Sequence, residues 1–390
     1  MAPVFTTVFV AFIAIVAGLG LHLKPYLQAV GLGKTVTPVG NSKCRTLPEL
    51  QACEKVVLHE PSGHLWLACS NFEGRKHWTP ALDRLDASRR STDDYVARVD
   101  PETNTVTRMK LTSFTEERGL SVHGMDVVPS EIDPTILYVY LVNHRPPIHG
   151  DATRIGADSV IEIFETRQGS ETLEHVRTVH DPEVIITPND VMGSSDGKSF
   201  FFTNDYGIKA GWRRTLNLLL QLSGGSVGYC HLHTGCKLAA RNVHAANGIV
   251  KGRGANETVF VGDNVLGDIS VFEKQADNSL VLTEVIKTGI AHDNLAIDGN
   301  GALWTAGLSD GLGFMLKQFK EPPAKIASSA LRVTVNHGVG AFYGEKYKID
   351  KVFEDAGELV SGCTSAVYDS TKGRLYMHGL ASPHLTICEL

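Results

Sequence analysis

The chain has 390 residues, with 43 Asp and Glu side chains against 37 Lys and Arg and a formal net charge of −6 at pH 7. Apolar residues make up 43% of it and charged residues 21%, which is the composition of a globular protein with two or three ordinary domains or one large all-β domain. An acidic balance without a run of Lys or Arg excludes nucleic acid as a partner.

The first two dozen residues are an uncharged apolar stretch. Residues 4–21 (VFTTVFVAFIAIVAGLGL) carry no charge, and Lys24 follows them. This length lies at the short limit of a membrane span and exceeds the usual apolar core of a signal peptide. A signal-anchor is favoured over a leader removed after Gly20, and either one directs the chain into the secretory pathway. We expect an anchor helix and linker over 1–35. A domain over 36–390 follows it, membrane-anchored on the lumenal or extracellular side, or secreted if the leader is cleaved.

From residue 45 onward one unit recurs six times: a short polar cluster, an apolar strand, a turn with Gly or Asp, and a second apolar or aromatic strand. The copies span residues 53–70, 123–144, 189–205, 247–264, 293–307 and 364–379. Further strand pairs are predicted over 96–111, 161–179 and 268–286. No unit can bury both of its faces alone, so the repeats predict an all-β fold, a six-bladed β-propeller with four-stranded blades around a central channel.

A long charged loop interrupts this pattern over residues 70–94, with room for short helical turns. Loops of this length in a compact domain are usually functional or mobile. Its Phe72 and Trp78 either cover a pocket or pack on the surface.

Seven cysteines, at positions 44, 53, 69, 230, 236, 363 and 388, suit an oxidising compartment, and the odd count leaves at least one thiol free. Cys230 and Cys236 flank HLHTG between two predicted strands, which favours a local hairpin disulfide. His231 and His233 alternate with them, but the spacing is not that of a zinc site, so zinc is the less favoured interpretation. Asn256 begins an Asn-Glu-Thr sequon, where we expect glycan.

The polar residues that begin the innermost strand of each blade converge on the propeller axis. They are Glu54, His123, Asn189, Asn247, Asp293 and Thr364. Each alone has an ordinary structural explanation, since Asn and Asp are common turn residues. Taken together, one subset offers only oxygen ligands, two of them carboxylates, as Ca²⁺ prefers; its members are Glu54, Asn189, Asn247, Asp293 and the adjacent Asn294. The sequence therefore predicts a calcium site in the channel.

Several short motifs are similar to those of a known family. They are HG at 123–124, LVNH at 141–144, PND at 188–190, TND at 203–205, ANG at 246–248, HDN at 292–294 and the terminal CEL at 388–390. These motifs occur over residues 44–390 in the family's order and with broadly its spacing. The chain therefore resembles a distant, fungal-type member of the paraoxonase/arylesterase family of calcium-dependent lactonases. The resemblance implies a six-bladed propeller with two calcium ions in its channel.

The family pattern also implies roles for single residues. The catalytic calcium would be held by Glu54, Asn189, Asn247, Asp293 and Asn294 and would polarise the substrate carbonyl. His123 would be the base that activates water and His144 its partner. From the residues alone, His144 is as easily a hydrogen-bonded histidine of the core or rim. Cys388 would pair with Cys44 or Cys53, and the family pattern points to Cys44.

A second, structural calcium is implied at the Asp190 carboxylate and the backbone carbonyl of Met125, together with an acidic residue directly after Glu54. This chain has Lys55 at that position, and an ammonium group cannot ligate Ca²⁺. Either the second site is lost and Lys55 pairs with Asp190, or the local register is shifted by one residue. We favour the loss.

The predicted function is calcium-dependent hydrolysis of lactones or aryl esters by a His-activated water, with no serine nucleophile. Small-molecule esters or lactones are the expected substrates and a membrane the expected attachment; no oligomeric state is predicted. The alternatives are a gluconolactonase-like hydrolase of sugar lactones, a strictosidine-synthase-like propeller without metal, and a non-enzymatic membrane-tethered propeller that calcium only stabilises. Five oxygen ligands argue against the second alternative, and the presence of His123 argues against the third.

Overall fold

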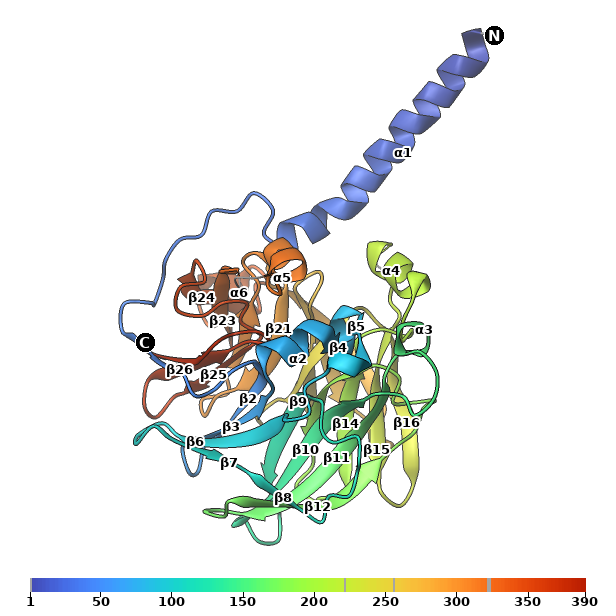
Figure 1. Cartoon of the computed structure of the whole chain (residues 1–390). Helices are drawn as coiled ribbons and strands as arrows, with labels where there is room; N and C mark the ends of the chain where they lie inside the picture. The colour runs from blue at the N-terminus through green and yellow to red at the C-terminus, as the bar shows by residue number, and fades with distance from the viewer. Residues whose placement is uncertain (1, 221, 255–256, 321–323) are drawn as a thin grey trace.

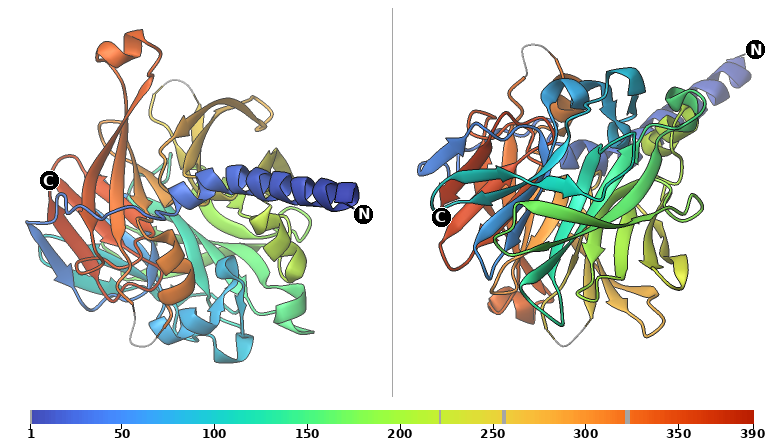
Figure 2. Two further views of the ribbon diagram at one scale, coloured as in Figure 1. Left: turned by 90° about the horizontal axis from the view of Figure 1, so that it is seen from above. Right: turned by 60° about the horizontal axis from the view of Figure 1, so that its bottom comes forward.

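The structure, a computed structural model, describes residues 2–220, 222–254, 257–320 and 324–390. Six sheets surround a central axis, and the strands of each sheet, which are mostly antiparallel, follow one another from the axis outward (Figure 2). The predicted six-bladed β-propeller is therefore confirmed. The expected glycan site at Asn256 lies outside the described residues.

From the innermost strand outward, the first blade contains β2 (Cys53–His59), β3 (His64–Cys69), β6 (Tyr95–Asp100) and β7 (Thr105–Arg108). In the same direction, the second contains β9 (Val122–Pro129), β10 (Ile136–Arg145), β11 (Asp158–Arg167), β12 (Thr172–Val179) and β8 (Lys110–Thr112). The third contains β13 (Pro188–Gly193), β14 (Ser199–Asn204), β15 (Gly225–His231) and β16 (Gly235–Val243).

The remaining three blades have four strands each. The fourth contains β17 (Ala246–Lys251), β18 (Thr258–Asp263), β19 (Asp268–Lys274) and β20 (Leu280–Lys287). The fifth contains β21 (His292–Ile297), β22 (Leu303–Gly307), β23 (Ser328–Val335) and β24 (Tyr347–Asp355). The sixth contains β25 (Ser365–Asp369), β26 (Arg374–His378), β27 (Leu385–Glu389) and, on its outer edge, β1 (Cys44–Leu47).

The second blade departs from the prediction of four strands. Its fifth strand, β8, pairs in parallel with β12, with Lys110 opposite Thr172. The chain leaving the first blade thus runs along the edge of the second before it returns to the axis at β9. An edge strand is protected in this way from pairing with another molecule.

Three disulfides lock strand pairs. Cys44 of β1 and Cys388 of β27 are opposite each other and bonded, which joins the first strand of the propeller to the last. Cys230 is bonded to Cys236 across the β15–β16 hairpin, so these sulfurs are not available as metal thiolates. The bond between Cys53 and Cys69 was not predicted, and Cys363 is a buried free thiol.

Apolar side chains fill the space between blades. One cluster joins Trp66 and Val96 of the first blade to Val122, Leu141 and other residues of the second. Neighbouring innermost strands are therefore packed closely along the axis, and their first residues come together at one end of the channel.

Helices are short after the N-terminal one, as the sequence predicts. The regular helices are α1 (Ala2–Ala29), α2 (Phe72–His77), α3 (Ala152–Ile155), α4 (Trp212–Leu219), α5 (Gly311–Lys317) and α6 (Val339–Phe342). The loop over 70–94 adds the 3₁₀ turns η1 (Pro80–Leu82) and η2 (Ala87–Arg89) and the strand pair β4 (Trp78–Thr79) and β5 (Arg84–Leu85). Helices α1, α2, α4 and α5 lie on the same end of the propeller (Figure 1).

Helix α1 projects from that end of the propeller (Figure 1). Of the described helices, it is the one long and apolar enough to cross a membrane, over Phe12–Ala29. This is compatible with a signal sequence or an anchor, and the anchoring role stays a prediction.

Candidate functional site

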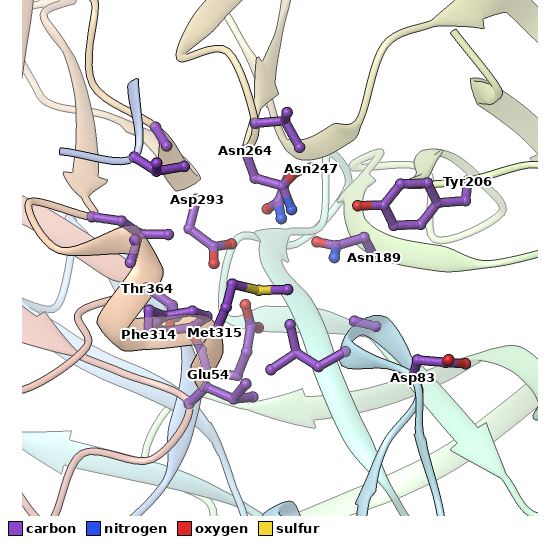
Figure 3. Close-up of a pocket in the computed structure, with 18 of the residues that line it drawn as sticks. Glu54, Asp83, Asn189, Tyr206, Asn247, Asn264, Asp293, Phe314, Met315 and Thr364 are labelled. Atoms are coloured by element: carbon purple, nitrogen blue, oxygen red, sulfur yellow. The ribbon is translucent and has the colours of Figure 1, made fainter. Parts of the chain in front are cut away.

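The predicted blade-start residues lie together around one pocket. Five of them occupy the second position of the innermost strands β2, β9, β13, β17 and β21, and Thr364 directly precedes β25. All six line a cavity of about 260 Å³. Figure 3 shows Glu54, Asn189, Asn247 and Asp293 pointing toward a common centre.

Local irregularities of the strands turn these side chains toward the axis. The pairing register shifts at the ligand positions of β2, β13, β17 and β21, for example between Ala246 and Ile249. Bulges of this kind bend a strand and redirect its side chains. Gly124 and Gly248 permit the close approach of neighbouring blades, because a Cβ on Gly124 would lie 2.3 Å from the carbonyl oxygen of Asn189 and one on Gly248 would lie 2.4 Å from the amide nitrogen of Leu295.

The oxygen atoms of this cluster fit a calcium ion. Four of the predicted ligands each have a buried oxygen without a hydrogen-bond partner among the described residues: Oε2 of Glu54, Oδ1 of Asn189, Oδ1 of Asn247 and Oδ1 of Asp293. Buried polar atoms are nearly always paired, so four unpaired oxygens around one cavity are suited to bind a cation. The described part of the chain has no group of three or more His, Cys, Asp or Glu side chains that could hold a metal. This cluster is of a different kind, because it combines two carboxylates with Asn amides, which are ligands suited to Ca²⁺.

Asn294 is arranged differently from the other four predicted ligands. Its Nδ2 donates to Oε1 of Glu54 at 2.5 Å, and its Oδ1 accepts from Nζ of Lys55 at 3.2 Å. The Asn294 amide thus links the Glu54 carboxylate to the Lys55 ammonium. Its oxygen already has a partner.

Lys55 and Asp190 form a buried ion pair just below the oxygen cluster. Nζ of Lys55 lies 2.6 Å from Oδ2 of Asp190, and these residues are 5% and 0% exposed. Oδ2 of Asp190 also accepts from the backbone N–H of Ile249 at 3.0 Å. Lys55 and Met125 both line a second cavity of about 400 Å³ further along the channel. The ammonium therefore stands beside the Asp190 carboxylate, and the loss of the second calcium site stays a prediction.

Burial and neighbouring charges shift the pKa values of the carboxylates in the channel. Burial raises the pKa of Glu54 and of Asp190, and the Lys55 ammonium opposes both shifts. Burial, followed by the charges of Glu54 and Asp190, raises the pKa of Asp293 well above its ordinary value. Buried Asp126 and Arg75 belong to the same group of interacting charges, Asp126 beside Lys55 and Asp190 and Arg75 beside Glu54.

The two predicted histidines are neighbours. The ring centroids of His123 and His144 are 5.1 Å apart. His123 lines the pocket, whereas His144 lies behind it with its Nδ1 2.9 Å from Oγ of Ser159. Burial, and then the charges of Arg75 and Lys55, lower the pKa of His123 to about 3. The His123 imidazole is therefore neutral at physiological pH.

The loop over 70–94 supports the histidines from behind. Arg75 in α2 is buried and donates to the carbonyl of Val122 at 2.6 Å, directly before His123. Nε1 of Trp78 donates to the carbonyl of His144 at 2.8 Å. Phe72 packs against Phe319. Neither aromatic residue lines the pocket; this loop contributes Ala81, Leu82 and Asp83 to the lining instead.

A group of four charged residues holds the end of β10, where His144 lies. Arg145 binds Glu116 at 2.8 Å and Asp158 at 2.7 Å, and Arg118 binds the same two carboxylates at 2.8 and 2.7 Å. The hydrogen bonds from Arg118 hold the pKa of Glu116 at about 2. Sequence reasoning missed these residues because they look like ordinary surface charges.

The chain contains three G-x-S-x-G matches, at residues 193–197, 224–228 and 307–311, around Ser195, Ser226 and Ser309. A nucleophilic serine in this motif would stand on a sharp turn between a strand and a helix. Here Ser226 belongs to β15, opposite Asn204 of β14, whose Nδ2 donates to its Oγ at 3.0 Å. That match is part of a regular strand, which is not the setting of a nucleophile elbow. Ser195 lies between the strands β13 and β14. Ser309 lies between β22 and α5, but its Oγ donates to Oε1 of Glu354 at 2.9 Å and it does not line the pocket.

Many of the other residues that line the pocket are apolar, although Asp83, Tyr206 and Arg214 line it too. Its lining includes Leu82, Val265, Leu308, Phe314, Met315 and Leu380, together with Tyr26 and Val30 from the end of α1. Asn264, which sequence reasoning also missed, lines the pocket with an Oδ1 that has no partner among the described residues. A ligand here would meet polar oxygens at the channel end and hydrocarbon at the mouth.

Fold and site together define a six-bladed propeller with a polar, buried cluster at one end of its axial channel and an apolar pocket above it. Residues 36–390 match the Arylesterase family, and the chain belongs to that family.

Individual relatives are distant. The chain is 24% identical over 364 residues to serum paraoxonase/arylesterase 1 of Mus musculus, covering 91% of both chains. It is 22% identical over 361 residues to serum paraoxonase/lactonase 3 of Homo sapiens, covering 92% of this chain and 93% of that one. Among solved structures, a luciferin-regenerating enzyme matches with a TM-score of 0.50 at 13% identity over 90% of this chain and 95% of that chain, which shows the shared fold. Family membership supports a hydrolase that acts on esters or lactones.

Proposed function

We propose that this chain hydrolyses lactones and aryl esters with one bound calcium ion and a water activated by His123. The observation that carries the proposal is the set of four unpaired buried oxygens, from Glu54, Asn189, Asn247 and Asp293, in the pocket that His123 also lines. A bound calcium ion would polarise the substrate carbonyl and stabilise the developing oxyanion.

The protein's own groups have complementary tasks. Glu54, Asn189, Asn247 and Asp293 would hold the ion, and Asn294 would fix the orientation of Glu54 through its 2.5 Å hydrogen bond. His123 would take the proton from the attacking water, because it lines the pocket and its Nδ1 has no partner among the described residues. Ser159 would position His144 behind it through the contact at Nδ1.

We further propose that Lys55 replaces a second metal ion. Its ammonium pairs with Asp190 at 2.6 Å and contacts Oδ1 of Asn294 at 3.2 Å. A cation that is part of the chain would hold the innermost strands together without a second calcium. Calcium removal would then impair catalysis more than folding.

The disulfides and the N-terminal helix indicate the cellular compartment of the protein. Three disulfides suit an oxidising compartment. We propose that α1 is a signal-anchor that holds the propeller at a membrane of the secretory pathway, with the pocket on the lumenal or extracellular side and glycan at Asn256.

The test compares three substrates: a long-chain lactone, an aryl ester and a sugar lactone, each with excess calcium and after exhaustive chelation. Hydrolysis of the first two should require calcium, and Asn247→Ala should abolish it. Asn300→Ala, a change of the same type at an exposed position, should have no effect. Hydrolysis of the sugar lactone alone would favour the gluconolactonase-like alternative. Full activity without calcium would rule out the proposed mechanism.

A further inference from the structure

The last turns of α1 lie against the propeller with one face. Leu23, Tyr26 and Leu27 are half-buried and Val30, directly after the helix, is 6% exposed, whereas Leu21 is 73% exposed. Positions 23, 26, 27 and 30 follow the three- and four-residue spacing of a single helix face. The apolar helix therefore has two parts, an exposed one and a final segment that packs on the protein.

Backbone hydrogen bonds hold this final segment beside β21, the strand that carries Asp293. The carbonyl of Ala29 accepts from the N–H of Ala291 at 2.9 Å, two residues before Asp293, and the carbonyl of Val30 accepts from the N–H of Gly311 at 3.0 Å. Gly31 ends the helix with a φ of +79°, and a Cβ there would lie 2.1 Å from the carbonyl oxygen of Ser309. This close fit needs glycine.

The same segment forms part of the pocket wall. Tyr26 and Val30 line the cavity that also contains Glu54, His123 and Asp293. Ala29 belongs to the core cluster that includes Leu308, Phe314 and Leu380, three further residues of the pocket lining. Burial raises the pKa of the Tyr26 phenol, so this side chain presents a neutral ring to the cavity.

We propose that the end of α1, through Tyr26 and Val30, contacts the non-reacting hydrocarbon part of the substrate and sets the preferred chain length. The proposal rests on the proposed function, because it assigns the apolar half of the same pocket. A leader removed after Gly20 would leave this wall intact. The N-terminal segment is then a part of the active site and a specificity determinant as well as an attachment.

The test uses the full-length chain and two substrates, γ-butyrolactone and a lactone with a seven-carbon alkyl substituent. Tyr26→Ala should lower kcat/KM for the alkyl lactone about tenfold while that for γ-butyrolactone changes less than about twofold, since only the longer substrate reaches the mouth. Tyr26→Phe should restore the wild-type ratio. Leu21→Ala, on the exposed part of the same helix, should leave the ratio unchanged. A melting temperature for each variant checks that it is folded.

A second variant guards against a folding defect. Val30→Phe should narrow the mouth and again impair the alkyl lactone selectively. Equal effects of Tyr26→Ala and Val30→Phe on both substrates, or no effect on either, would overturn the inference. If the wild-type protein hydrolyses neither lactone, the proposed function fails. Calorimetry with 5-hydroxydodecanoate then tests the inference separately. Binding to Tyr26→Ala that is about tenfold weaker than binding to the wild-type protein supports a contact between Tyr26 and the alkyl chain, and unchanged binding refutes it.

Discussion

Replacement of Lys55 is the most informative perturbation of the channel. Lys55→Met removes the ammonium and leaves the carboxylate of Asp190, which is 0% exposed, without its partner at 2.6 Å. The lost contact to Asn294 at 3.2 Å also frees the amide that orients Glu54. Removing one member of a buried ion pair typically lowers the free energy of unfolding by about 3–5 kcal/mol. We expect a loss in this range.

Lys55→Asp should have a different outcome. It places a second carboxylate next to Asp190, and two carboxylates repel each other unless a cation lies between them. We expect a variant that is strongly destabilised after chelation and recovers when calcium is added. It should bind one calcium ion more than the wild-type protein.

The assay is urea unfolding of wild type, Lys55→Met and Lys55→Asp, each with excess calcium and after chelation, together with a count of tightly bound calcium. Lys346→Met is the control. It removes an ion pair with Glu284 whose Lys346 side chain is 60% exposed, and should cost less than about 1 kcal/mol. Wild-type stability of Lys55→Met, or two calcium ions in the wild-type protein, would refute the assignment of Lys55.

Further predictions concern the histidines, the closing disulfide and acid stability. His123→Gln should lower kcat by about 10²–10⁴-fold and His144→Ala by less, and equal activity of His123→Gln and wild type would exclude His123 as the base. Cys44→Ser opens a bond between residues 344 positions apart and should lower the free energy of unfolding by about 4–6 kcal/mol in non-reducing urea titrations; an unchanged midpoint would contradict this. The folded pKa of Glu116 is about 2, below its ordinary value of 4.5, so its stabilisation is present above pH 4.5 and is lost as the pH falls toward 2. Glu116→Gln should therefore destabilise the protein at pH 6 but scarcely at pH 2, and a difference independent of pH would contradict the assignment.

The architecture and the polar cluster could be predicted because both follow from a local pattern repeated along the chain. In the structure Glu54, His123, Asn189, Asn247 and Asp293 begin five innermost strands, which bring them to one pocket. A propeller places equivalent positions of its blades at equivalent distances from the axis. Recognising the start of each repeat was therefore sufficient to collect residues that are more than 200 positions apart.

Features that depend on packing between unlike segments could not be predicted. The bond between Cys53 and Cys69 requires the exact register of β2 and β3. The parallel pairing of β8 with β12 and the contact of Tyr26 with the pocket join segments that share no repeat. Ser226 shows the converse, since its motif matches an enzyme pattern but lies in a regular strand.

Calcium titration of the metal-free protein tests the central claim most directly. Calcium would be added in sub-stoichiometric steps to chelated, refolded wild-type chain while hydrolysis of a long-chain lactone is followed. Activity should be absent at first, rise in proportion to the calcium added and level off at one equivalent per chain. Activity before any calcium is added would contradict the mechanism, and a plateau at two equivalents would contradict the role of Lys55 as the second cation.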